Sequence, residues 1–135
     1  MAQPTQVFHK GDDLDATAIT ATTFTGTHVG GQQDTVVAIT GDGAITIVPC
    51  SVFLSKGSAA AITLAAPTTV THDGYTIRIV AISAQAHVVT GSVDGFNAKG
   101  SSGTLTFGGA LGDSVTLVAK GGHWYTLAKI NVTVA

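Results

Sequence analysis

The chain contains 135 residues, carries a net charge of −2 and has only 10% charged residues. This length fits one ordinary domain, and the lack of a basic cluster excludes nucleic acid as the main partner. No apolar run approaches the roughly 18 residues that span a bilayer, and residues 1–6 lack the basic start and apolar stretch of a signal peptide. We therefore expect a protein that is made in the cytoplasm and has no membrane partner.

The choice of residue types favours strands over helices. All eight acidic residues are Asp, and Thr, Ala, Val, Gly and Ile dominate the uncharged remainder. Straight-chain residues such as Glu normally cover helix surfaces, whereas Thr, Val and Ile fit a pleated sheet. The only cysteine, Cys50, excludes an internal disulfide, so stability must come from packing or oligomerisation. The sequence therefore predicts an all-β fold that shares some of its weakly charged surface.

Residues 1–30 differ from the rest of the chain and are predicted to form an extended N-terminal arm, followed by one domain over residues 31–135. The apolar residues of this segment are spaced too widely to close a core alone, so we expect them to contact their own domain or a neighbouring molecule. An ordinary first strand or two of the same domain is the alternative interpretation. The candidate contact residues are Val7, Phe8, Leu14, Ile19 and Phe24.

Short strand-like runs alternate with turn signals from residue 34 onward, which predicts an antiparallel β-sandwich or barrel, jelly-roll-like in its arrangement. Residues 35–40 and 44–48 flank Gly41-Asp42-Gly43, which predicts a hairpin because Asp-Gly supplies the positive φ angles of a tight turn. The clearest strand covers residues 75–82, where Ile77 and Ile79 alternate with Arg78. Further strands are predicted at residues 59–64, 87–90 and 104–107.

A second hairpin is predicted near the end of the chain, where Lys120-Gly121-Gly122 separates residues 114–119 from residues 123–127. The apolar alternation then changes phase, because the apolar residues from Ile130 onward lie opposite to Leu127. Either a bulge near Ala128 or departure of the chain end from its sheet explains this change.

Three similar turn-and-strand segments begin near residues 42, 73 and 112. Each combines Asp and Gly with a strand in which Thr lies between apolar residues. Because their spacing is unequal, we interpret them as shared hairpin chemistry and not as a solenoid repeat.

Known local signatures of catalysis are missing from the sequence. It has no Gly-x-Ser-x-Gly elbow, and the glycine-rich loop at residues 95–103 lacks the Gly-Lys-Ser/Thr ending of a phosphate-binding loop. Cys50 sits beside Pro49 at a strand end, where a buried structural thiol is the expected role. The hypothesis is therefore a protein that is not an enzyme and needs no cofactor.

The titratable residues follow turns more closely than they follow metal motifs. The five histidines never occur at the two-to-five-residue spacing of a zinc motif, so no metal site is predicted. Asp42, Asp73, Asp94 and Asp113 lie in turns beside glycine, where a structural role suffices to explain them.

The aromatic pair Trp124 and Tyr125 is the candidate for ligand binding, because flat rings stack on sugars. Adjacent strand residues point to opposite faces, so the two rings cannot form one platform. At least one of them is predicted to lie in the core.

The second half of the chain resembles a known family. The residues that carry this likeness include Gly95-Phe96-Asn97, Phe107-Gly108-Gly109-Ala110 and His123-Trp124-Tyr125, within a segment of roughly residues 60 to 130. This segment is similar to the small capsid decoration, or cement, proteins of tailed bacteriophages, and similar segments occur in virion fibres. Residues 1–59 have no such match.

The resemblance implies a structural virion protein on the outer surface of the phage head. Such a protein is a β-module, commonly a homotrimer, that binds the major capsid protein and stabilises the shell. Its location would be the capsid surface, after synthesis in the host cytoplasm. The alternative hypothesis is a receptor- or carbohydrate-binding β-module of a phage fibre or tail, which would use Trp124 or Tyr125.

Overall fold

The computed structural model describes residues 35–92, 95–100 and 102–135. These residues form ten strands and no helix, as the composition predicted. The strands are β1 (Thr35–Ile39), β2 (Gly43–Ile45), β3 (Cys50–Leu54), β4 (Ala61–Leu64), β5 (Thr76–Ala81), β6 (Val88–Gly91), β7 (Thr104–Phe107), β8 (Ser114–Lys120), β9 (His123–Ile130) and β10 (Val132–Val134).

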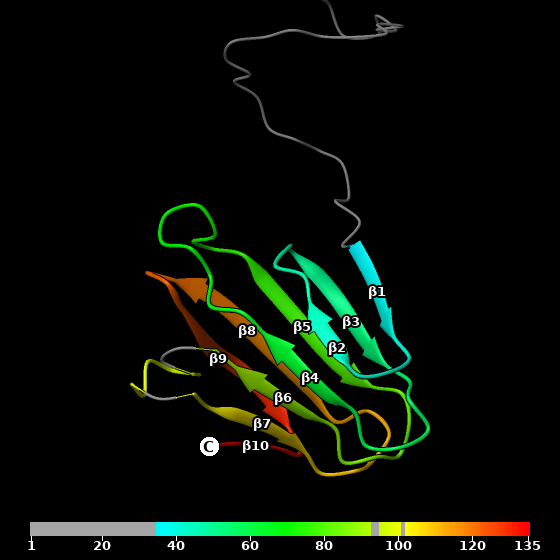
Figure 1. The fold of residues 1–135 in the computed structure, drawn as a ribbon. Coiled ribbons are helices and arrows are strands. Elements are labelled where there is room, and N and C mark those ends of the chain that lie inside the picture. Colours follow the sequence, from blue (N-terminus) through cyan, green and yellow to red (C-terminus); the bar gives the residue numbers. More distant parts are fainter. Residues whose placement is uncertain (1–34, 93–94, 101) are drawn as a thin grey trace, which may run out of the picture. The chain divides into compact units, whose positions relative to one another are not determined.

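The strands form two five-stranded sheets with one core between them (Figure 1). The first sheet has the order β1-β3-β5-β8-β9, and the second has the order β10-β7-β6-β4-β2. Alternate residues of the central strands are buried, so Ile77 and Ile79 face the core while Arg78 is exposed. A β-sandwich architecture is thereby confirmed, with the side-chain period of two that half-buried strands require.

The first six strands are stacked in parallel, which differs from the prediction. The chain passes from one sheet to the other after each strand, so β1, β3 and β5 pair in parallel in the first sheet and β2, β4 and β6 do so in the second. The predicted hairpin at Gly41-Asp42-Gly43 was wrong, because this turn carries the chain between the two layers. The sheets are therefore mixed and not purely antiparallel, and a jelly-roll arrangement is not confirmed.

A repeated two-strand unit underlies this stacking. Cys50 pairs with Ile77 and Ala61 pairs with Val88, so the same offset of 27 residues relates β3 to β5 and β4 to β6. This arrangement is a short solenoid, which the sequence interpretation had rejected. The unit above it is shorter, since Thr35 pairs with Cys50 only 15 residues later, and this inequality conceals the repeat in the sequence.

The last four strands pair antiparallel and close the sandwich. The hairpin predicted at residues 120–122 is confirmed, with Gly121 and Gly122 both at positive φ between β8 and β9. Both explanations for the change of apolar phase also hold. Leu127 is the extra residue of a bulge in β9, and after Asn131 the chain leaves for the other sheet, where β10 pairs with β7.

Candidate functional site

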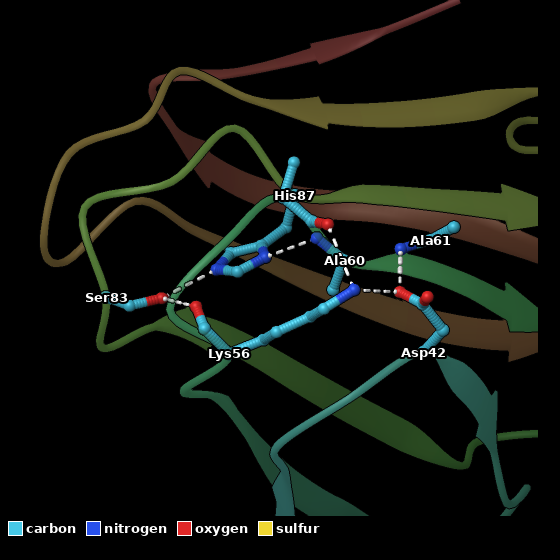
Figure 2. A network of polar contacts seen from close by, with 7 residues as sticks. Asp42, Lys56, Ala60, Ala61, Ser83 and His87 are labelled. Carbon is cyan, nitrogen blue, oxygen red and sulfur yellow. Dashed lines mark hydrogen bonds and ion pairs between the residues drawn. The ribbon is translucent and has the colours of Figure 1, made fainter.

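A polar network joins the turns of the stacked units at one end of their strands (Figure 2). Asp42 lies in the turn between β1 and β2, Lys56 in the loop between β3 and β4, and Ser83 and His87 in the loop between β5 and β6. The Lys56 Nζ atom is 2.7 Å from Asp42 Oδ1, which also accepts the Ala61 N–H at 2.8 Å. The network therefore fixes the three turns against each other.

His87 is the buried member of this network, with none of its surface exposed. Its Nδ1 accepts the Ala60 N–H at 3.1 Å, so the proton of the neutral ring lies on Nε2, which donates to Ser83 Oγ at 2.9 Å. Ser83 in turn donates to the Lys56 carbonyl at 2.7 Å. Burial, together with the nearby Lys56 charge, lowers the pKa of His87 and keeps the ring neutral.

Three of the four turn aspartates have the structural roles that the sequence predicted. Asp42 binds the Ala61 N–H, Asp73 accepts the Gly121 N–H at 2.7 Å, and buried Asp113 accepts the Ala110 N–H at 2.9 Å. The pKa of Asp73 is lowered chiefly by Lys120, and that of Asp113 chiefly by its backbone donor. Asp94 lies outside the described residues. These carboxylates therefore serve to hold loops in place.

Neither a metal cluster nor a membrane span is found in the part of the chain that the structure describes. Within those residues, no group of three or more His, Cys, Asp or Glu side chains could hold a metal ion. No helix there is long and apolar enough to cross a membrane. Cys50 is buried in the core at 2% exposure, as predicted.

The aromatic pair divides between the core and the surface. Trp124 is 1% exposed, and its Nε1–H donates to the Ala65 carbonyl at 2.8 Å. Tyr125 lies on the opposite face of β9 and is half-buried. The prediction that at least one ring belongs to the core is confirmed, and Trp124 has no face left for stacking on a ligand.

One lateral end of the sandwich, formed by β9 and β10, is closed by several devices. Phe96 bridges to Trp124, and the Asn97 side chain accepts the Thr126 N–H at 2.9 Å, so the loop at residues 95–97 covers the start of β9. The bulge at Leu127 then interrupts the edge, and the Lys129 ammonium donates to the Val132 carbonyl. Short strands, bulges and lysines are the usual protection of sheet edges. We call β9 and β10 with residues 95–97 the closed end.

The opposite lateral end, formed by β1 and β2, has none of these devices, and we call it the open end. Neither strand contains a charged residue, a proline or a bulge, and each pairs on one side only among the described residues. Val37 and Ile39 point toward the core but are only partly buried, whereas their partners Val52 and Leu54 are completely buried. Val36 on the outer face is 68% exposed. The core is therefore incompletely covered at this end within the described residues.

The outer face of the second sheet carries no charge, because none of its five strands contains a charged residue. At the carboxyl ends of β2, β4 and β6 this face contains a pocket of about 340 Å³. The pocket is lined by Ala44, Ile45, Thr63, Leu64, Ala65, Thr90, Gly91 and Ser92. Its walls combine methyl groups with three hydroxyl groups.

The candidate contact residues of the predicted arm, Val7, Phe8, Leu14, Ile19 and Phe24, lie outside the described residues, so their role stays a prediction. The sequence interpretation missed His87 because it considered histidines only at metal-motif spacing. The signal for the network was the 27-residue offset of the two stacked units, which places three turns side by side.

No protein-family model and no curated protein matches this chain. The functional argument therefore depends on the geometry of the described residues and on the resemblance in the second half of the sequence.

Proposed function

We propose that this chain is a structural virion protein, a decoration or cement protein that binds the outer surface of a phage head and stabilises it. The observation that carries the proposal is the open end, where unprotected edge strands and half-exposed core residues lie together. A surface of this kind favours a neighbouring molecule that supplies the missing cover.

The charge distribution supports contact with protein and not with a charged polymer. No strand contains an acidic residue, and only Arg78, Lys120 and Lys129 bring permanent positive charge to the strands. Weakly charged faces lose little hydration when they meet a similar surface. A homotrimer bound at many places on a shell would add weak contacts through avidity.

The same charge distribution guides the test of the open end. Val36→Lys places a charge on the exposed face of β1, and Leu127→Lys places the same charge on the closed end at a similar exposure, 63% against 68%. In co-sedimentation with phage heads, Val36→Lys is expected to lose binding about tenfold or more, because a charge must be buried. Leu127→Lys is expected to bind as the unchanged protein does. Equal binding of both variants would contradict the role of the open end.

The role of the predicted arm is tested by deleting residues 1–27. We expect the shortened protein to keep its unfolding temperature, because residues 35–135 contain the whole described core, and to lose binding to heads. Full retention of binding would refute the arm's role. A large drop in unfolding temperature would show instead that these residues complete the sandwich.

The alternative function, a receptor- or carbohydrate-binding module of a fibre or tail, has less support because Trp124 is buried. Tyr125 is the aromatic residue that this function would use. A glycan array separates the two proposals, since a decoration protein is expected to bind no glycan on it.

A further inference from the structure

The loop between β4 and β5 presents an apolar side chain in an unusual backbone conformation. Val70 has a φ of 70° and is 80% exposed. Left-handed backbone is rare for non-glycine residues and is least favourable for a β-branched side chain, which crowds the following carbonyl. Glycine or asparagine would fit this position with less strain.

The surrounding loop is held firmly, so this conformation is imposed on Val70. Asp73 accepts hydrogen bonds from the Lys120 ammonium and the Gly121 N–H, both at 2.7 Å, and from the backbone N–H of Val70. On the other arm of the loop, His72 Nδ1 accepts the Thr68 N–H at 2.8 Å. The loop is therefore tied to the turn between β8 and β9 and also across its own base.

A strained residue that packs on little of its own chain gives the fold no evident advantage. Strain of this kind persists where the structure around it is fixed and is often associated with function. The exposed isopropyl group of Val70 is consequently suited to a contact outside its own chain.

The 340 Å³ pocket on the second sheet has the chemistry of a matching receptor site. Ala44, Ile45 and Leu64 give it apolar walls, and Thr63 and Thr90 add hydroxyl groups beside them. The tip of the loop, Thr69-Val70-Thr71, has the same combination of hydroxyl and apolar groups. Neither the tip nor the pocket contains a charged side chain, so two copies would meet here without charge repulsion.

We propose that the Val70 loop of one copy inserts into this pocket of a second copy and that this contact builds the homo-oligomer. The loop and the pocket are different patches, so the contact is heterologous and closes as a ring, of three copies under the proposed function. The inference deepens the proposed self-assembly and rests on it.

The contact extends beyond the loop tip. A loop tip covers far less than the roughly 800 Å² per partner of a standard interface. The pocket opens on the uncharged outer face of the second sheet, which continues the contact around it. Val70 would then be the central anchor of a wider, weakly charged interface.

The test measures self-association of the full chain by sedimentation velocity over a range of concentrations, without phage heads. Val70→Asn removes the apolar group but tolerates left-handed backbone, so we expect association to weaken about tenfold or more while the unfolding temperature stays the same or rises. Ala44→Phe, at an exposed position, fills the pocket and is expected to weaken association similarly.

Leu111→Asn is the matched control, because Leu111 is 69% exposed and lies outside both the loop and the pocket. It is expected to leave association unchanged. A protein that is monomeric at every concentration would overturn the inference, as would unchanged association of either Val70→Asn or Ala44→Phe. Val36→Lys should associate normally in this assay, so failure of self-association is distinguishable from failure of head binding.

Discussion

The two ends of the sandwich use the same kinds of strand in opposite ways. At the closed end, residues 95–97, a bulge and Lys129 protect β9, and Phe96 and Trp124 are completely or almost completely buried. At the open end, β1 and β2 have uncharged, regular edges, and Val37 and Ile39 are only partly covered. The difference shows that this chain contains the means to protect an edge and applies them at one end only.

Core substitutions at the two ends should differ most in their effect on stability. Phe96→Ala is expected to lower the free energy of unfolding by about 3–5 kcal/mol, because it removes a completely buried ring beside Trp124. Val37→Ala is expected to lower it by about 1 kcal/mol or less, because that side chain is already partly in water. Urea denaturation measures both values. Similar losses at the two positions would mean that Val37 is covered in the intact protein.

The buried histidine gives a smaller effect that depends on pH. The pKa of His87 is lowered in the folded state from 6.5, so the unfolded chain binds its proton first as the pH falls, and stability decreases below about pH 6.5. His87→Asn should cost about 1–3 kcal/mol at pH 7.5, because the bond to Ser83 is lost.

The measurement is the free energy of unfolding at pH 7.5 and pH 5.0 in both proteins. His72 and His123 are present in both, so the difference between the two slopes isolates His87. A slope that His87→Asn leaves unchanged would show that another group causes the pH dependence.

The smallest effect is expected for the ion pair in the same network. Asp42→Asn keeps an oxygen for the Ala61 N–H but removes the charge that pairs with Lys56. Because both side chains reach solvent, we expect a shift in unfolding temperature smaller than that of His87→Asn and absent at high salt. The pKa of Asp42 is lowered by Lys56, so the contribution of the pair is lost only as the pH falls below 3.8. A salt-independent shift would contradict this account.

Local patterns in the sequence predicted much of the fold. Residues 104–107 form β7 as expected, the glycines at 121 and 122 form the hairpin, and the change of apolar phase correctly indicated both the bulge at Leu127 and the departure of β10. These features depend on side-chain alternation and turn chemistry within a few residues. Such signals are visible without knowledge of distant partners.

Strand pairing could not be predicted in the same way. The turn at Gly41-Asp42-Gly43 suits a hairpin as well as a passage between layers, and only the partners of β1 and β2 distinguish the two. Strand β3 was missed as a strand, although Cys50, Val52 and Leu54 alternate and lie in the core. The open end and the contact of Val70 with the pocket are likewise properties of pairing and exposure, which composition does not reveal.

The central claim, that the open end is completed by a neighbouring molecule, is tested most directly by amide hydrogen exchange of the full chain, alone and mixed with phage heads. The account predicts that β1 and β2 exchange faster than β9 in the free protein and become protected when heads are added, while β9 is unchanged. Protection of β1 and β2 equal to that of β9 in the free protein, or no added protection on heads, would contradict it.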